Sequence, residues 1–475
     1  MSKIQVDAIE QQTACGTTLT AGGGAGKTVV VDATTVTLGR CGGTVALASG
    51  ASQTGFGRTG TVNWDTTPKT GTFTAVSGVG YFADTSSTAF NMNLPAGVAG
   101  AIVSVADYTR TFQTNNLTIV PNGSEKIGGV VANLIASTEG QSITLVYVDA
   151  TEGWINTAES TGQTGLAAEF ISASVSGACN TLATVDTNYK VATFVGPGTF
   201  TVCSVGNPLG STTVDYLVVG GGGAGPSSGG GDGITGGGGG GGFRFYANPT
   251  TNPQSGPGSP LNGPAAIPVS VQGYTIVVGG GGPRGSGPGG WTPGVASSGL
   301  GITSAGGGRG GRGDPTANGQ TGGSGGGGSN TGSAGAGNTP PVSPSQGNPG
   351  GAGSNPYATG GGGGGAIVAA VPITGPRQGI GGAGGGLTGF GTSGQSSGGQ
   401  YYFSGGGGGA YNGPTPAPGA AGGIGGGGSG GYSNACGNAG TANTGGGGGG
   451  ASDYPGGNGG GNGGSGIVII RYKFQ

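Results

Sequence analysis

The chain has 475 residues, of which 129 are glycine and only 7% are charged, and its formal net charge is −2. A chain with so few basic residues lacks the positive surface that binding to nucleic acid or to an anionic membrane requires. It contains no histidine, which excludes Ser-His-Asp and Cys-His catalysis and removes the commonest ligand of transition metals.

No apolar stretch approaches the roughly 20 residues of a membrane-spanning helix, so we expect no membrane insertion. The first seven residues, MSKIQVD, contain no apolar core of the kind that a signal peptide needs. We therefore expect synthesis in a cytosol without a signal peptide. Helical periodicity is nearly absent, while Thr, Val, Ser and Gly alternate between turn signals, which predicts a mainly β protein.

The first two predicted domains cover residues 1–56 and 57–163. The segment 1–56 has short apolar runs at 28–31 and 35–38, too little apolar mass to fold alone, and we expect it to associate with copies of itself. The segment 57–163 reads as a β-domain with Tyr147 and Trp154 in its core. Its predicted strands are 60–63, 72–76, 80–82, 89–92, 102–105, 117–120, 142–148 and 153–156.

A third, small β-domain is predicted over residues 164–213, with strands at 192–195 and 198–205 on either side of Pro197. The fourth segment, 214–475, holds most of the glycine. It begins with an apolar strand at 214–219, contains further strands at 243–246, 266–271 and 274–278, and closes with a strand at 466–472. Because a disordered tail has no need of a closing strand, this frame predicts a folded glycine-rich domain.

Long glycine runs can fold as polyglycine II rods, which have three residues per turn and no internal hydrogen bonds. Every backbone N–H and C=O of such a rod needs a partner, and neighbouring rods can supply one for each. Glycine has no Cβ, so these backbones can pack closely. We therefore expect a bundle of rods in the segment 214–475, with connecting loops at the rod ends.

Two short motifs have simpler structural readings. Residues 21–28, AGGGAGKT, satisfy a loose phosphate-loop pattern, but a β-run follows where such a loop needs a helix. Residues 312–314 spell Arg-Gly-Asp, a triplet that arises by chance in a chain so rich in glycine. The five cysteines fit no zinc pattern, and whether Cys179 and Cys203 pair is left open. We expect no cofactor and no metal.

Several local patterns resemble bacteriophage tail-fibre and adhesin proteins with a C-terminal glycine-rich domain of the polyglycine II type. The opening residues and the β-rich stretch before residue 160 are similar to modules of such fibres, and the two ends of the glycine-rich segment are the most specific match. The segments concerned are 1–7, 80–85, 107–112, 115–119, 145–148, 153–154, 215–219, 274–279, 443–445 and 466–472.

This resemblance implies a non-enzymatic structural protein on the outside of a virion. It implies a homotrimeric fibre with a β-rich shaft, attached to other virion proteins through its N-terminus. Its glycine-rich tip would bind a host-surface glycan or an outer-membrane protein. Two alternatives stay open: a purely structural capsid or neck fibre without receptor binding, and a tailspike-type enzyme that cleaves polysaccharide.

Aromatic residues between the glycine blocks are the candidate receptor-binding residues, because aromatic faces stack on sugar rings and tyrosine hydroxyls add hydrogen bonds. An equally weighted alternative is that they cap the rods and fill gaps in the bundle. The preferred patch, Tyr401, Tyr402, Phe403 and Tyr411, flanks one glycine block. The candidates are Trp291, Tyr357, Phe390, Tyr401, Tyr402, Phe403 and Tyr411, and Tyr432 and Tyr454 lie in similar connectors.

An enzymatic role would need paired carboxylates, since a glycosidase uses two of them on either side of the scissile bond. The chain has 17 acidic residues, mostly in its first half. Candidates for such a pair are Asp84, Asp107, Asp149 and Glu152, for which we expect turn and surface roles instead.

Overall fold

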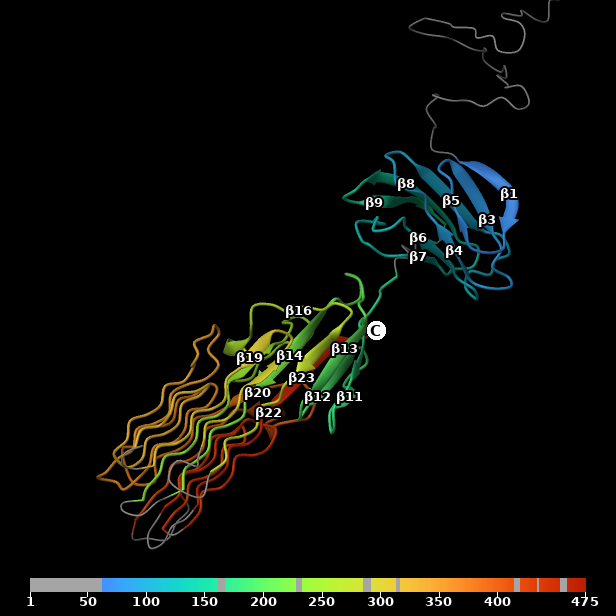
Figure 1. The fold of residues 1–475 in the computed structure, drawn as a ribbon. Helices are drawn as coiled ribbons and strands as arrows, with labels where there is room; N and C mark the ends of the chain where they lie inside the picture. Colours follow the sequence, from blue (N-terminus) through green and yellow to red (C-terminus); the bar gives the residue numbers. More distant parts are fainter. Residues whose placement is uncertain are drawn as a thin grey trace, which may run out of the picture. The chain divides into compact units, whose positions relative to one another are not determined.

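The structure is a computed structural model that describes residues 62–160, 167–227, 233–284, 292–312, 317–413, 419–433, 435–452 and 459–475. The chain divides into two compact units, Met1–Thr61 and Val62–Gln475. The first unit, and with it the predicted strands at 28–31 and 35–38 and the motif at 21–28, lies outside the described residues. Below, residues 62–160 are called the β-domain and residues 167–475 the glycine domain, and each is described by itself. Both are built almost entirely from strands and extended segments, which confirms a mainly β protein (Figure 1).

The β-domain consists of two sheets. One has the strand order β1-β3-β5-β8-β9 and the other β2-β4-β6-β7. The strands are β1 (Asn63–Lys69), β2 (Phe73–Thr74), β3 (Val79–Ala83), β4 (Phe90–Asn93), β5 (Ile102–Asp107), β6 (Leu117–Val120), β7 (Leu134–Ala136), β8 (Ser142–Asp149) and β9 (Gly153–Glu159).

Successive strands from β1 to β6 alternate between these two sheets. As a result β1, β3 and β5 pair in parallel in one sheet, and β2, β4 and β6 pair in parallel in the other. The chain therefore coils through both layers, because parallel neighbours need a crossover and each crossover here contains a strand of the opposite sheet. Antiparallel strands β7, β8 and β9 complete the two sheets.

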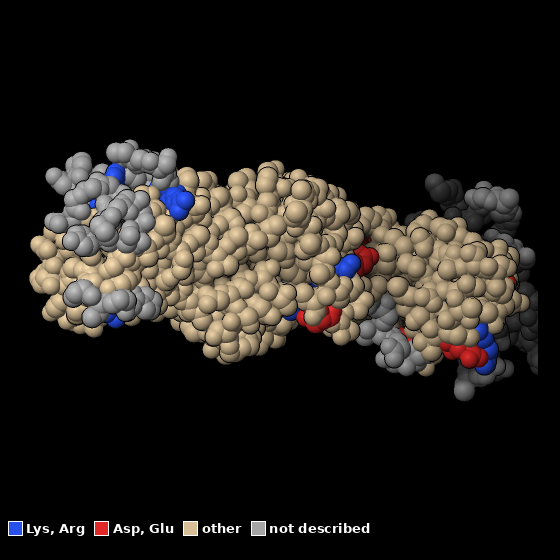
Figure 2. Space-filling model, turned by 90° about the horizontal axis from the view of Figure 1, so that it is seen from below, with Lys and Arg blue, Asp and Glu red and all other residues tan. Residues whose placement is uncertain are grey.

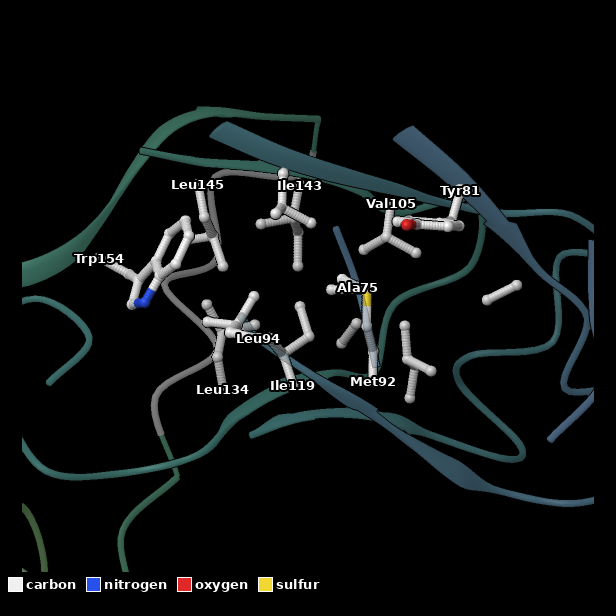
Figure 3. Packing of buried hydrophobic residues seen from close by; sticks show 14 of the residues in the cluster. Ala75, Tyr81, Met92, Leu94, Val105, Ile119, Leu134, Ile143, Leu145 and Trp154 are labelled. Atoms are coloured by element: carbon white, nitrogen blue, oxygen red, sulfur yellow. The ribbon is translucent and has the colours of Figure 1, made fainter. Parts of the chain in front are cut away.

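The core of the β-domain lies between its sheets and is made of side chains (Figure 3). Leu145 and Val105 of one sheet point toward Ile119 and Met92 of the other, as period-two alternation requires. Trp154 is fully buried and donates its indole N–H to Glu125 Oε2 at 3.1 Å. Tyr147 is half-buried against it with ring centroids 5.5 Å apart, so both aromatic core predictions are confirmed.

The sequence prediction placed one strand of the β-domain too early and missed another. The predicted strand 60–63 meets β1 only at Asn63, where β1 begins. β7 contains only three residues and is identified by its pairing with β6 rather than by its length. The remaining predicted strands overlap β2, β3, β4, β5, β6, β8 and β9.

The glycine domain contains a central sheet with the order β11-β12-β23-β14-β15, to which β16 adds through β14. Its strands are β10 (Ser172–Val175), β11 (Thr181–Thr184), β12 (Tyr189–Phe194), β13 (Gly198–Ser204), β14 (Thr213–Val219), β15 (Phe243–Tyr246), β16 (Ile267–Pro268), β17 (Gly273–Ile276), β18 (Ser297–Gly299), β19 (Ile302–Ser304), β20 (Gly385–Leu387), β21 (Gln395–Ser397), β22 (Gln400–Phe403) and β23 (Ile467–Lys473), with one 3-10 turn at Ser259–Leu261.

The central sheet is covered on both faces. Val218 of β14 and Val468 of β23 belong to one apolar cluster, which also contains residues of the sheet β10-β13-β17. Leu217 and Ile469 belong to a second cluster, which contains residues of the sheet β20-β22-β21. This three-layer arrangement explains the sequences TVDYLVV and IVIIRYK, because a strand that is buried on both faces is apolar at nearly every position.

The predicted boundary at residue 214 falls inside this shared structure. β12 pairs along its length with β23, and β13 pairs with β17. The strands of residues 167–213 thus belong to the same sheets as the first and last strands of the segment 214–475. The reason is that β12 pairs with the free edge of β23, and β13 packs on one apolar face of the central sheet, so residues 167–213 complete the same sheets.

The glycine runs form extended rods with a hydrogen-bonding period of three residues. In the run 236–242, every third amide donates to the same neighbouring run, and the intervening amides donate to two other runs. The donor and acceptor pairs are Gly236–Gly311, Gly239–Gly308 and Gly242–Ala305; Gly237–Gly361 and Gly240–Gly364; and Gly238–Gly448 and Gly241–Gly445. A repeat of three residues is that of polyglycine II.

The carbonyls of the same run accept from three further runs. Gly327 and Ser324 donate to Gly237 and Gly240, and the other donors are Gly223, Gly220 and Gly407. The rod 236–242 is therefore surrounded by six others, some parallel and some antiparallel to it, which lie side by side in Figure 1. The core of this bundle is backbone.

Close packing of the rods depends on the absence of side chains. A Cβ built on Gly237 would lie 2.2 Å from the carbonyl oxygen of Gly407, and one on Gly238 would lie 2.0 Å from that of Gly223. Both neighbours are backbone atoms, so a larger residue would force two rods apart. The bundle confirms that the glycine-rich segment is folded.

Charged residues are sparse on the face shown in Figure 2, but one charged pair is buried. Asp215 of β14 lies opposite Arg471 of β23, with 3.0 Å between Oδ2 and Nη1. Burial raises the pKa of the Asp215 carboxyl, and the attraction to Arg471 opposes the shift only in part. None of the described segments forms a helix with the length and apolarity that crossing a membrane requires.

Candidate functional site

The rods begin where the strands of the glycine domain end. β14 passes directly into the rod that starts at Gly220, and β22 passes into the rod that starts at Ser404. The rod 236–242 leads in the opposite direction into β15. One end of the bundle is thus fixed to the central sheet, and the opposite end, here called the distal end, carries connectors between rods (Figure 1).

A stacked group of side chains occupies the distal end of the rod 404–410. The rings of Tyr411 and Tyr432 lie 5.7 Å apart at 23°, and the guanidinium of Arg377 lies over the Tyr411 ring at 5.2 Å. Tyr411 is only 7% exposed as a result. Tyr432 donates its hydroxyl to the carbonyl of Gly413 at 2.8 Å. We call these three side chains, Tyr411, Tyr432 and Arg377, the distal stack.

Backbone pairing holds the distal stack in place. Tyr411 forms bridges with both Tyr432 and Thr359, and the amide of Arg377 donates to Thr359 Oγ1 at 3.3 Å. A Cβ on Gly413 would lie 1.9 Å from the Tyr411 hydroxyl, so a larger residue at position 413 would push the Tyr411 ring out of its present place. The stack is therefore a largely buried support and not a freely accessible surface.

Tyr357 is the exposed aromatic beside this support, with 38% of its surface accessible. It lies in a short loop, residues 355–358, closed by the bridge between Ser354 and Thr359. Thr359 donates its hydroxyl to the Tyr357 carbonyl at 2.8 Å, and Thr359 in turn pairs with Tyr411. A rigid base with a projecting tyrosine is an arrangement that can stack on an apolar or sugar-ring surface.

The preferred patch predicted from the sequence does not come together. Tyr401, Tyr402 and Phe403 lie in β22 at the central-sheet end of their rod, whereas Tyr411 lies at its distal end. Tyr411 follows Phe403 by eight residues, which corresponds to about 25 Å in a polyglycine II rod. Phe403 is buried, Tyr401 packs against the same apolar cluster and Tyr402 is half-buried, so these residues fill the packing role that the sequence left open.

The other predicted binding residues also differ in where they lie. Phe390 is buried in the cluster that contains Leu217 and Ile469, where it packs against the central sheet. Trp291 and Tyr454 lie outside the described residues. Of the predicted set, Tyr357 and Tyr411 are therefore the ones that the structure places at the distal end, the first exposed and the second buried.

Arg377 was not predicted as part of the site. Its sequence context, PITGPRQGI, resembles any other connector, and the contact with Tyr411 joins residues 34 positions apart through the packing of rods.

The described arginines of the rods are Arg284, Arg309, Arg312 and Arg377. Arg309 is half-buried, and burial lowers the pKa of its guanidinium; Gly313 and Asp314 of the Arg-Gly-Asp motif lie outside the described residues.

The candidate carboxylates of a glycosidase pair are occupied by turn amides. Asp107 accepts from the amides of Thr111, Phe112 and Gly140. Asp149 accepts from Thr151 and Glu152. Hydrogen bonds from Ser86 and Thr109 lower the pKa of Asp84, the opposite of what a general acid requires.

A pocket of about 280 Å³ lies beside the buried ion pair, at the end of the central sheet away from the rods. The Arg471 guanidinium stacks on the Tyr189 ring at 3.5 Å and donates to the Thr251 carbonyl at 3.2 Å. Because Asp215 neutralises this arginine, the pair serves to join β14 to β23.

Cys179 and Cys203 are exposed free thiols, and no group of three or more acidic or cysteine side chains among the described residues could hold a metal ion.

Comparison with known proteins assigns the glycine domain to a family. A family model described as a glycine-rich domain matches residues 193–473, more than half of the chain. A search of curated proteins found no match. The matched region starts within β12 and ends at the last residue of β23, so it contains the central strands as well as the rods. The chain belongs to the glycine-rich domain family.

Proposed function

We propose that the protein is a homotrimeric fibre on the outside of a phage virion, whose distal end binds a host-surface receptor without catalysis. The observation that carries this proposal is the construction of the bundle: rods held together by backbone hydrogen bonds, with the projecting Tyr357 at the end away from the central sheet. The resemblance of the sequence to tail-fibre proteins supports the viral setting and the attachment through the N-terminus.

In the rod bundle, the rods provide stability and the connectors between them provide the residues available for recognition. Connectors contribute little to its backbone core, so their sequences can vary while the rods stay in register, and binding residues are commonly found on loops that a rigid scaffold positions. At the distal end, the stack of Tyr411, Tyr432 and Arg377 supports the loop that carries Tyr357. A glycan fits this surface best, since an exposed tyrosine offers both a stacking face and a hydroxyl.

The environments of the carboxylates support a non-enzymatic role. A glycosidase needs one carboxyl with a raised pKa beside a second, ionised one. Among the described residues, the carboxyl whose pKa burial raises is Asp215, and it is paired with Arg471. Incubation of the purified chain with host polysaccharide should release no new reducing ends; their appearance would favour the tailspike alternative.

Receptor binding is tested with the labelled full-length chain on a panel of bacterial strains. We expect saturable binding to at least one strain, which Tyr357→Ala weakens by roughly tenfold. Tyr402→Ala is the matched control, because Tyr402 is a half-buried tyrosine at the other end of the bundle. No saturable binding to any strain, or equal loss in both variants, would contradict a distal receptor site and favour a purely structural fibre.

The trimer is tested separately by sedimentation equilibrium. The expected mass is three times the 44.1 kDa of one chain. A monomer at micromolar concentration would contradict the fibre model whatever the outcome of the cell-binding assay.

A further inference from the structure

The outer face of the sheet β1-β3-β5-β8-β9 in the β-domain carries a second group of aromatic side chains. Tyr81 and Ala83 of β3 point into the core between the sheets, as Figure 3 shows for Tyr81. Gly80 and Phe82 alternate with them and therefore face outward. A Cβ built on Gly80 would lie 2.8 Å from the Trp64 ring, so the Trp64 side chain lies across this outer face.

Three rings form a row on this face. The Trp64 and Phe82 centroids are 4.9 Å apart at 31°, and Phe82 and Tyr108 follow at 6.2 Å and 64°. Trp64 is 44% exposed and Tyr108 56% exposed, while Phe82 is half-buried between them. We call Trp64, Phe82 and Tyr108 the outer aromatic row.

Packing within the β-domain does not account for this row. None of its members belongs to the side-chain core between the two sheets. In the described part of the chain, three aromatic side chains are exposed: Trp64, Tyr108 and Tyr357. Two of the three thus lie within one small area, although aromatic rings normally gain most from burial.

Hydrogen-bonding groups border one end of the row. Asp84 follows Phe82 by two positions, directly after the end of β3, and its Oδ1 accepts from Thr109 Oγ1 at 3.1 Å. Thr109 Oγ1 also lies 2.9 Å from Thr111 Oγ1. The amide of Tyr108 donates to the Ala83 carbonyl at 2.9 Å, so a half-buried carboxylate and two hydroxyls lie near Tyr108.

We propose that the outer aromatic row binds a saccharide chain, with sugar rings stacked on Trp64 and Tyr108 and sugar hydroxyls hydrogen-bonded by Asp84 and Thr109. Aromatic faces beside carboxylate and hydroxyl groups suit a ligand that has C–H faces and many hydroxyls. The site is separate from the distal end and does not depend on it.

The size of the row favours a saccharide over a second copy of the chain. Each aromatic side chain can bury about 150–250 Å², so three half-exposed rings offer roughly 300 Å² between them. A stable protein interface buries about 800 Å² on each partner. The neighbouring Arg110 and Glu139 are also exposed and charged, whereas the centre of a protein interface is depleted in charge.

The test uses the full-length chain on an array of bacterial surface polysaccharides and plant and algal glycans. The variants are Trp64→Ala/Tyr108→Ala, Trp64→Phe, and Val148→Ala as a control, because Val148 is exposed in the same sheet but outside the row. We expect the double variant to lose binding to at least one glycan by roughly tenfold or more. Trp64→Phe should retain most of the affinity and Val148→Ala all of it.

Three outcomes would overturn the proposal. The wild-type chain could bind no glycan on the array, or the double variant could bind the same glycans as the wild type. The double variant could also sediment as a smaller assembly than the wild type, which would identify the row as an interface between copies. Tyr357→Ala distinguishes the two sites. It should weaken binding to cells through the distal end, and on the array it should leave binding to the glycans recognised by the outer aromatic row unchanged. Unchanged thermal unfolding of the double variant checks that its β-domain is folded.

Discussion

The β-domain and the rod bundle of the glycine domain both form a core that excludes water and satisfies the backbone. The core consists of side chains in the β-domain and of backbone in the bundle. In the β-domain, side chains such as Leu145 and Trp154 exclude water from the space between two sheets, and strand pairing satisfies the backbone. In the bundle, the backbone does both: each rod satisfies its amides and carbonyls on its neighbours and approaches them too closely for a side chain to fit. A high glycine content therefore does not by itself indicate disorder, provided that the runs are long enough to pair on several sides.

The two regions should consequently respond to mutation in opposite ways. A side-chain core fails when atoms are removed, because a cavity remains. A backbone core fails when atoms are added, because two rods must move apart. The central sheet connects the two kinds of core. Its strands β14 and β23 have apolar side chains on both faces, and each is directly continuous with a rod.

The largest expected effect is at the central sheet. Ile469 is fully buried in β23, between β12 and β14. Ile469→Asp would place an unpaired charge there, at a cost of several kcal/mol, which is comparable to the whole stability of a typical domain at about 5–15 kcal/mol. We expect the glycine domain to become sensitive to protease while the β-domain stays resistant.

Val277→Asp is the control for this change, because Val277 is an exposed aliphatic residue next to β17. It should leave both regions resistant. If Ile469→Asp also makes the β-domain sensitive, the two cores are not independent and the comparison between them fails.

A cavity should destabilise the β-domain next most strongly. Leu145 is buried in its core, and Leu145→Ala should cost about 2–5 kcal/mol of unfolding free energy. Val148→Ala, on the same strand but exposed, should change it by less than about 0.5 kcal/mol. Urea unfolding followed by tryptophan fluorescence measures both, since Trp154 reports on this core. Equal effects would mean that the core is not where the buried side chains indicate.

Adding one methyl group should destabilise the bundle. Gly237→Ala would bring a Cβ within 2.2 Å of the Gly407 carbonyl oxygen, and overpacking of this kind costs about 1–3 kcal/mol. Gly280→Ala is the matched control, because nothing lies within 4 Å of its Cβ. At an open position this change should be neutral, or stabilising by about 0.4–1 kcal/mol through the unfolded state. Thermal unfolding of the glycine domain should therefore move to lower temperature for Gly237→Ala and stay unchanged or rise for Gly280→Ala, and equal shifts would contradict a tightly packed backbone core.

Sequence pattern identified the parts of the fold that depend on local order. The apolar runs 214–219 and 466–472 appear as the neighbouring strands β14 and β23, and the glycine runs between them are folded rods. Pattern could not show that β12 pairs with β23 or that the rod 236–242 has six neighbours. Those facts depend on which segments meet in space, and glycine runs are too alike in sequence to specify a partner.

The candidate site shows the same limit. Tyr401 and Tyr411 are close in sequence, yet the rod between them carries them to opposite ends of the bundle. Connector position alone also could not separate the buried Tyr411 from the exposed Tyr357. Trp64 and Tyr108 were not singled out because their exposure follows from the alternation of β3 and the gap left by Gly80, which requires the strand register to be known.

The smallest expected effect is a difference in pH dependence between the two regions. Burial raises the pKa of Asp215 above its ordinary value of 3.8, so the folded glycine domain holds this proton more tightly than the unfolded chain. The contribution of Asp215 to stability is therefore present at low pH and is lost as pH rises through its folded pKa. The pKa of Asp84 is lowered by hydrogen bonds from Ser86 and Thr109, so its contribution is present above 3.8 and is lost as pH falls through its folded pKa.

Thermal unfolding between about pH 6 and about pH 3 tests this contrast. The Asp84→Asn variant should flatten the acid-side loss of stability in the β-domain, and the Asp215→Asn variant should remove a contribution of opposite sign in the glycine domain. The two variants isolate these groups from the other carboxylates of the chain. If both substitutions change the pH dependence in the same direction, Asp215 is ionised as readily as Asp84, and the attraction to Arg471 outweighs burial in the central sheet.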